Sequence, residues 1–267
     1  MTDFEDTSRA IYIEAGGPVG SVVLNRPAKR NAMSEAMWRD LPQAVQALDN
    51  DGAVRVIVVR SSSDAAFCAG ADIAELEAIA RDKKRQESNR VAIREAQRSL
   101  ARAKKPTIAR ITGACMGGGC GIALHCDMRI AAHGARFGIT PAKLGLVYPL
   151  NDTKQLMDLV GPSKAKSMLF TGRVLDVEEA LAIGLIDELC APEELDIKVS
   201  ALSHQIAAVS QYSVRGIKIL VQNVLDGQCD DDDATAEMFR AAHEGQDAVE
   251  GVRAFLEKRP ADFRWND

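Results

Sequence analysis

Three consecutive glycines, Gly117, Gly118 and Gly119, precede a compact apolar stretch in the centre of the chain. Glycine lets a ligand approach the main chain closely. If a helix begins at Gly118, its first N–H groups lack partners and point, with the positive end of the helix dipole, at one spot. Such a spot suits an anion, or an oxygen that becomes negative during a reaction. The alternative interpretation is a tight turn with close helix packing, because the spacing matches neither a phosphate loop nor a dinucleotide fingerprint.

The segments on either side predict the elements that hold these glycines. Thr107 to Thr112 is apolar and β-branched, which is typical of a buried strand, and Gly113 then permits a sharp turn. Ile122 to His125 predicts a short helix, and Asp127 to Ala132 predicts the next strand. The expected order is therefore strand, glycine turn, helix and strand.

The N-terminal third predicts further strands and helices. Ala10 to Glu14 and Val19 to Leu24 form an expected hairpin, and Ser34 caps an expected helix that ends near Asp49. Val54 to Arg60 predicts a strand that is buried on both faces. Phe67 to Ile73 follows a loop and leads into a helix near Ala74.

The C-terminal half is expected to become helical. We expect a loop or short helix from Phe137 to Tyr148, helices from Pro162 to Phe170 and from Asp176 to Ile183, and a strand from Leu185 to Cys190. Helical patterns follow at 193–209, 214–225, 234–243 and 246–258. The chain is therefore expected to combine an α/β core, residues 1–190, with a helical region, residues 191–267.

Two charged segments each have two interpretations. Residues 81–105 carry ten Lys and Arg side chains, which form either a solvated helix face or an attraction for a ligand with several phosphates. Residues 230–233 are four consecutive Asp, which form either an exposed helix N-terminus or a metal site. The metal site lacks a histidine or a spaced carboxylate to complete it, so no metal is expected.

Composition excludes several functional classes. The 267 residues are 46% hydrophobic and 27% charged, as in a soluble globular protein, and the net charge of −5 argues against nucleic-acid or anionic-membrane partners. The six cysteines contain no CxxC pair, so neither a disulfide framework nor a zinc site is expected. Without a signal-like N-terminus or an apolar span of about 18 residues, the expected location is the cytoplasm.

Three stretches together resemble the crotonase (enoyl-CoA hydratase/isomerase) superfamily. They are Asn25-Arg26-Pro27 with Asn31-Ala32, the run from Phe67 to Ile73, and Gly113 through Asp127. The segment from Glu250 to Arg259 is similar to the C-terminal signature of that family. The resemblance implies a spiral of ββα units with a C-terminal helical region, assembled as trimers or as hexamers.

The resemblance also implies a site for an acyl-CoA thioester, with no cofactor beyond the CoA of the substrate. The N–H groups of Ala71 and Gly118 would form an oxyanion hole. Lys29, Arg30 and Lys258 would lie near the CoA nucleotide, although exposed basic residues are usually only solvated. The remaining positions implied to contact substrate or CoA are Arg26, Ala69, Gly70, Asp72, Ile73, Gly117 and Pro141.

Departures from the family pattern affect the expected chemistry. Gly121 and Pro141 stand where hydratases carry their two catalytic glutamates, so ordinary hydration is in doubt. The stretch from Thr140 to Tyr148 resembles the TPxxLGxxY segment of methylmalonyl-CoA decarboxylases. This resemblance implies that Tyr148 lies beside the reacting group as a hydrogen-bond donor. The alternative is that Tyr148 is only a buried packing residue.

The favoured function is therefore an acyl-CoA lyase, because decarboxylation suits a pocket that lacks carboxylates. One alternative is a hydratase or isomerase that uses another acid–base group, such as Tyr148 or Asp152; Lys154 and His125 are lesser candidates. A second alternative is an acyl-CoA-binding protein without activity.

Overall fold

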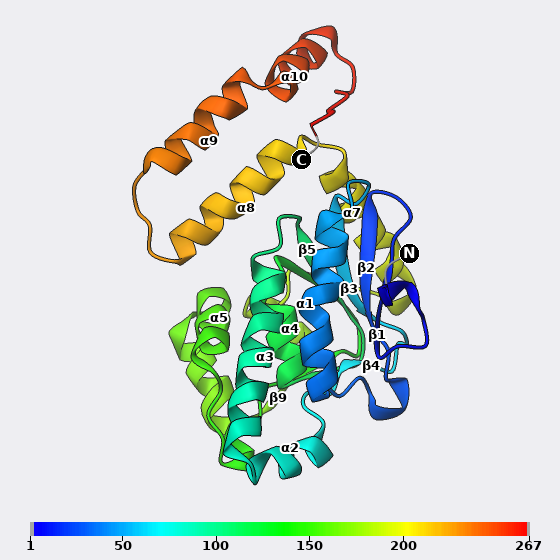
Figure 1. Cartoon of the computed structure of the whole chain (residues 1–267), viewed down its shortest axis with the longest axis vertical. Helices are drawn as coiled ribbons and strands as arrows, with labels where there is room; N and C mark the ends of the chain where they lie inside the picture. Colours follow the sequence, from blue (N-terminus) through cyan, green and yellow to red (C-terminus); the bar gives the residue numbers. More distant parts are fainter. Residues whose placement is uncertain (1–2, 266–267) are drawn as a thin grey trace.

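Two β-sheets form the body of the molecule in the computed structural model, which describes residues 3–265 (Figure 1). The six-stranded sheet contains, in spatial order, β1 (Ile11–Glu14), β2 (Val19–Leu24), β3 (Val56–Ser61), β5 (Thr107–Ile111), β7 (Met128–Ala132) and β10 (Glu188–Cys190). The four-stranded sheet contains β4 (Ala66–Cys68), β6 (Ala114–Met116), β8 (Arg136–Gly138) and β9 (Val174–Asp176). Pairing is parallel except for the hairpin β1–β2 and the pair β8–β9.

From β3 to β8, successive strands alternate between the two sheets, and each pair of strands is followed by a helix. The units are β3–β4 followed by α2 and α3, β5–β6 followed by α4, and β7–β8 followed by α5. The helices are α1 (Glu35–Asn50), α2 (Ile73–Ala80), α3 (Lys83–Ala101), α4 (Gly118–Leu124), α5 (Leu150–Thr171), α6 (Val177–Ala182), α7 (Leu195–Ala207), α8 (Gln211–Leu225), α9 (Asp233–Glu244) and α10 (Gln246–Glu257). This repetition confirms the predicted spiral of ββα units.

Local sequence explains the ends of several helices. Ser34 Oγ accepts the hydrogen bond of Met37 N and so caps α1, as the sequence predicts. The Asp run ends in a capping box, in which Asp232 and Thr235 exchange hydrogen bonds at the start of α9. The run is therefore the N-terminus of a helix.

The first half of α5 is an element that the sequence analysis missed. It begins at Leu150 and contains Asn151, Asp152 and Thr153, residue types with weak helix propensity. Gly161 has a φ of 75° and interrupts α5 just before Pro162, so only the second half gave a helical signal. The 3-10 helix η3 (Pro141–Leu144) matches the predicted short helix, whereas three-residue β8 was too short to recognise.

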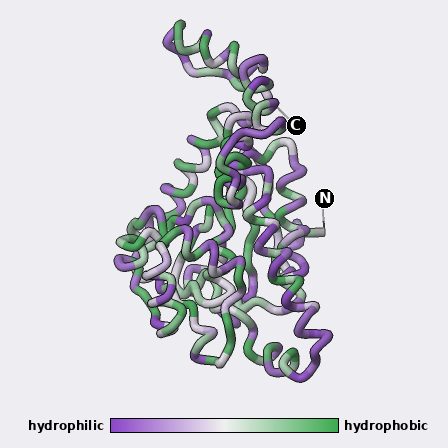
Figure 2. The backbone as a smooth tube through the Cα atoms, turned by 90° about the vertical axis from the view of Figure 1, so that its left-hand side faces the viewer, coloured by the Kyte–Doolittle hydropathy of each residue, from purple (hydrophilic) through white to green (hydrophobic). Residues whose placement is uncertain are grey.

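The C-terminal helices divide into two groups. Helix α7 packs on β2, β3, β5 and β7, where Leu195 and Val199 join a core cluster with Val58 and Ile108. Helices α8, α9 and α10 form an arm that extends from the body (Figure 1). Hydrophobic residues recur along the arm as well as in the body (Figure 2). The predicted domain division after residue 190 remains a prediction.

None of the helices between residues 3 and 265 is both long and apolar enough to cross a membrane.

Candidate active site

The loop before α2 exposes one backbone N–H group. Met33 N donates to Gly70 O over 2.7 Å, and Asp72 N donates to Met33 O over 3.0 Å. Ala71 lies between these two bonded residues, and alternate residues of extended backbone point their N–H groups to opposite sides. The Ala71 N–H therefore points away from Met33.

The Gly118 N–H lies beside that of Ala71. Gly118 is the first residue of α4, so its N–H has no acceptor within the helix. A Cβ atom placed on Gly118 would lie 3.9 Å from Ala71 N, and one placed on Gly70 would lie 3.7 Å from Gly118 N. Gly70 has a φ of 100°, a conformation that favours glycine, and a Cβ atom on Gly70 would lie 3.0 Å from Met116 O. The structure thus brings together the two predicted donors.

Arg26 and Asp72 support this loop. Their side chains form an ion pair at 2.9 Å, and a second Arg26 nitrogen donates to Ala32 O over 2.7 Å. The hydrogen bond from Arg26 lowers the pKa of Asp72, whose carboxylate also accepts from Ala74 N and so caps α2. These contacts hold the loop in place, while the predicted contact of both residues with substrate remains a prediction.

Four of the other predicted binding residues lie in two separate places. Lys29 and Arg30 are exposed and next to the loop, because Ala69 N donates to Arg30 O over 2.9 Å; Ile73, at the start of α2, is exposed as well. Lys258 directly follows α10, and α10 and α2 lie at opposite ends of the molecule (Figure 1). The structure of one chain therefore does not bring Lys258 to Lys29 and Arg30.

A polar cluster surrounds Gly121, one helical turn after Gly118. A Cβ atom on Gly121 would lie 2.5 Å from Gln97 Nε2, 3.2 Å from Asp152 Oδ1 and 3.5 Å from the Tyr148 hydroxyl. The Gln97 side chain is oriented by Asn151, whose Nδ2 donates to Gln97 Oε1 over 2.7 Å. Groups from α3, α5 and the loop before α5 thus converge where a glutamate at position 121 would begin.

Asp152 is the buried carboxyl group of this cluster. Its side chain is 2% exposed, and within residues 3–265 its Oδ1 accepts no hydrogen bond. Burial raises the pKa of Asp152 to about 7, and the nearby Gln97 amide opposes part of that rise. Both protonation states are therefore populated near neutral pH.

His125 and Tyr148 flank Asp152 and stay neutral. His125 Nδ1 lies 3.6 Å from Asp152 Oδ1 and 2.7 Å from Gly121 O, and burial lowers the pKa of His125. The Tyr148 hydroxyl donates to Gly117 O over 3.3 Å; burial, and then the charge of Asp152, raise the pKa of Tyr148. Lys154 pairs with Asp158 at 2.6 Å, on the partly exposed side of α5.

The sequence pointed to some residues of this cluster and not to others. Asp152 and His125 were lesser candidates, and Gln97 was missed. The sequence signal that could have indicated Gln97 is its place between the apolar residues Ala96 and Leu100. In the structure Gln97 is 1% exposed, within α3. Pro141, by contrast, opens η3 and contributes no acid.

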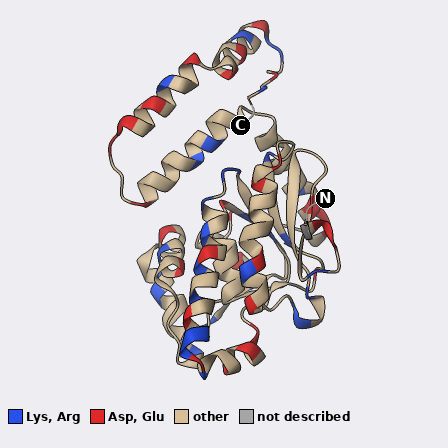
Figure 3. Cartoon of the chain, in the orientation of Figure 1, with Lys and Arg blue, Asp and Glu red and all other residues tan. Residues whose placement is uncertain are grey.

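Part of the basic segment forms surface ion pairs. Arg81 pairs with Glu77 at 2.7 Å, and Arg90 pairs with Glu87 at 2.6 Å. On α3 a few acidic positions stand among more numerous basic ones (Figure 3). These pairs favour the interpretation as a solvated face.

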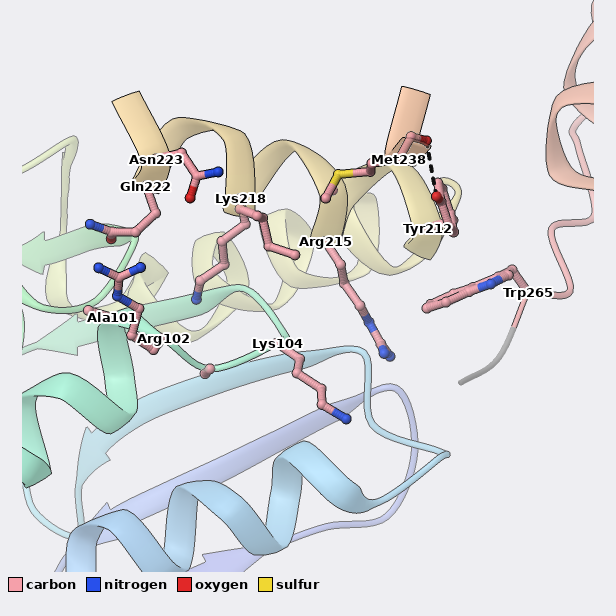
Figure 4. Close-up of a pocket in the computed structure, with 13 residues that line it drawn as sticks. Ala101, Arg102, Lys104, Tyr212, Arg215, Lys218, Gln222, Asn223, Met238 and Trp265 are labelled. Atoms are coloured by element: carbon pink, nitrogen blue, oxygen red, sulfur yellow. Dashed lines mark hydrogen bonds between the residues drawn. The ribbon is translucent and has the colours of Figure 1, made fainter. Parts of the chain in front are cut away.

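Apart from the candidate site, a cavity of about 380 Å³ lies between α8 and the end of α3 (Figure 4). Lys218 Nζ, in its wall, pairs with Asp127 at 2.7 Å. The Arg215 guanidinium lies 4.9 Å from the centre of the Trp265 ring. The Lys218–Asp127 pair joins the arm to the body, whereas the Arg215–Trp265 contact joins α8 to the segment that follows α10.

Comparisons with known proteins match the chain over almost its whole length. The enoyl-CoA hydratase/isomerase family matches residues 14–266. A crotonyl-CoA hydratase of Syntrophomonas wolfei is 35% identical, with 95% of this chain and 97% of that protein covered. The mitochondrial methylglutaconyl-CoA hydratase of Mus musculus is 33% identical, with 97% and 84% covered.

Solved structures agree with the sequence comparison. An enoyl-CoA hydratase/isomerase family protein from Hyphomonas neptunium has a TM-score of 0.94 at 38% identity, with 97% of this chain and 99% of that chain covered. The relatives described here are named as hydratases or as hydratase/isomerase proteins, and none as a decarboxylase. Family match, identity and fold together place the chain in the enoyl-CoA hydratase/isomerase family, within the crotonase superfamily.

Proposed function

We propose that this chain binds an enoyl-CoA thioester and stabilises its enolate through the N–H groups of Ala71 and Gly118. The observation that carries the proposal is the adjacency of these two backbone donors, one directed away from its strand partner and one at the start of α4. A thioester oxygen gains negative charge when its enolate forms. A fixed N–H donor stabilises such an oxyanion by about 3–4 kcal/mol.

We further propose that the reaction is a proton transfer of the hydratase/isomerase type. The expectation of decarboxylation rested on a pocket without carboxylates, and that premise is wrong because Asp152 is buried beside Gly121. A carboxylate there would also repel the carboxylate of a decarboxylase substrate. The names of the relatives support hydration or isomerisation in preference to a lyase reaction.

Calorimetry and turnover test the proposal together. We expect a saturated acyl-CoA to bind, and its free acid to bind at least tenfold more weakly, because the acid lacks both the thioester and the CoA phosphates. A panel of 2-enoyl-CoA and 3-enoyl-CoA thioesters should include at least one that is converted. Equal affinity for thioester and acid would contradict the proposal, and binding without any turnover would favour the alternative of an inactive acyl-CoA-binding protein.

A further inference from the structure

We propose that Asp152 is the catalytic acid and base of this chain, and that its reaction is the migration of a double bond in a 3-enoyl-CoA. The inference rests on the proposed function, since it assumes that the thioester oxygen occupies the site beside Ala71 and Gly118. It assigns the proton transfer to a carboxyl group on α5, because positions 121 and 141 carry none.

The position of Asp152 is the first part of the case. Gly118 and Gly121 are three residues apart on α4, so they lie on the same face of that helix. Asp152 Oδ1 reaches from the first turn of α5 to within 3.2 Å of the point where a side chain on Gly121 would begin. A carboxyl oxygen from another helix thus approaches the location that the missing glutamate would have occupied.

The burial of Asp152 is the second part. An oxygen that is buried and accepts no hydrogen bond destabilises the folded state, because it has lost its hydration without gaining a partner. Asp152 Oδ1 is such an atom in the described part of the chain. This oxygen therefore keeps an unused capacity to accept a hydrogen bond. A pKa of about 7 also allows the same carboxyl group to remove a proton and then return it at neutral pH.

The neighbours of Asp152 do not replace it as an acid–base group. Gln97, from α3, exchanges no proton near neutral pH. Tyr148, from the loop before α5, has a raised pKa and keeps its proton. His125, directly after α4, has a lowered pKa and places Nδ1 against Gly121 O. Gln97, held by Asn151, is instead a positioning residue that confines the Asp152 carboxyl group.

One carboxyl group is sufficient for double-bond migration. The Asp152 carboxylate removes a proton from C2 of the 3-enoyl thioester, and the electron pair of that C–H bond forms a C1–C2 double bond as charge moves to the thioester oxygen. The carboxylic acid then returns the proton to C4. The C3–C4 π electrons form the new C–H bond, C2 and C3 become doubly bonded, and the carbonyl group is restored. The proton removed is the proton returned, so no other reactant is consumed.

Asp152→Asn tests the assignment, with Asp158→Asn as the matched control from the same helix. Asp158 is paired with Lys154 and lies outside the cluster. We expect Asp152→Asn to lower kcat for 3-enoyl-CoA about 10²–10⁴-fold, while the affinity for a saturated acyl-CoA changes less than about threefold. The control should retain wild-type values for both quantities.

Two further measurements do not depend on the folding of a variant. The wild-type kcat/KM should rise with pH and level off above about 7, as the Asp152 carboxylate forms. Wild-type protein in D₂O should also exchange the C2 protons of a saturated acyl-CoA, as followed by NMR. A flat pH profile, or unchanged turnover in folded Asp152→Asn, would overturn the role of Asp152.

The outcomes separate this inference from the proposed function. If the wild-type protein does not bind thioesters, the proposed function fails. If it binds and converts them and Asp152→Asn does so equally well, only the inference fails. Hydration of crotonyl-CoA that is faster than migration of a 3-enoyl double bond would overturn the assigned reaction.

Discussion

Gln97 and Gly121 share one small space between α3 and α4: a Cβ atom on Gly121 would lie 2.5 Å from Gln97 Nε2. Real Cβ atoms do not approach a neighbour that closely. A side chain at position 121 would therefore displace the end of the buried Gln97 side chain, which Asn151 holds through a 2.7 Å hydrogen bond.

Gly121→Glu should consequently fail to create a working hydratase site. We expect overpacking against Gln97 to lower the free energy of unfolding by about 1–3 kcal/mol, measured by urea denaturation. Adding Gln97→Ala should recover most of that loss, because it removes the amide that the new side chain meets. A Gly121→Glu variant as stable as the wild-type protein would show that Gln97 moves aside freely.

Asp152→Asn should stabilise the protein at alkaline pH. The folded-state pKa of Asp152 is raised from 3.8 to about 7, so the native state binds a proton more tightly than the unfolded state does. Stability from this group is fully present below about pH 4 and is lost progressively as the pH rises to about 7, by at most about 4 kcal/mol. We expect thermal unfolding to show a higher Tm for Asp152→Asn at pH 8 and little difference at pH 4. The same difference at both pH values would contradict a raised pKa.

Gly118→Pro should abolish turnover, whereas Gly118→Ala should not. Proline removes the backbone donor, and loss of one such donor costs about 10²–10³ in kcat. Alanine keeps the N–H, yet it brings a Cβ to 2.9 Å from Trp38 Cζ2, so it reports the steric effect alone. Single-turnover kinetics on folded variants would measure both. Wild-type turnover in folded Gly118→Pro would remove the oxyanion-hole assignment.

Tyr148→Phe should only modulate the rate, by less than about tenfold. Its hydroxyl donates a 3.3 Å hydrogen bond to Gly117 O, which steadies the turn before α4, and the phenylalanine ring preserves the packing. A loss as large as that of Asp152→Asn would give the hydroxyl a direct role in the reaction.

The chain should assemble into a trimer or hexamer. Val252, Phe255 and Leu256 of α10 expose large apolar side chains, with Phe255 83% exposed. Light scattering at micromolar concentration should give three or six times the chain mass of 28.8 kDa. Phe255→Glu should shift the mass towards one chain, whereas Arg253→Gln on the same helix should not. A wild-type mass of one chain would contradict this expectation.

The sequence predicted those parts of the fold that depend on local patterns. The hairpin and the cap at Ser34 follow from strand periodicity and side-chain capping, and both are confirmed. The helix expected from Ile122 to His125 is present, but it begins earlier, at Gly118. The first half of α5 was missed because tertiary packing overrides the weak helix propensity of Asn151, Asp152 and Thr153.

The part of the candidate site that could be predicted is the oxyanion hole, which consists of backbone N–H groups. The resemblance to the crotonase superfamily implied that the N–H groups of Ala71 and Gly118 lie together, and the structure places them side by side. The cluster around Asp152 depends on side chains from three elements, and its members Gln97 and Asp152 are 55 positions apart in the chain. No spacing rule connects them; only the packing of α3, α4 and α5 shows that they meet.

The arm formed by α8, α9 and α10 has a consequence for how the protein unfolds. Its side chains Ile217, Phe239 and Phe255 are exposed, so the arm gains little stability from burial within one chain. If neighbouring chains cover these side chains, mass action makes the opening of the arm depend on protein concentration, while the opening of the sheets does not. Amide hydrogen exchange at two dilutions would then show slower exchange in α8–α10 at the higher concentration, and an unchanged rate in β3, β5 and β7.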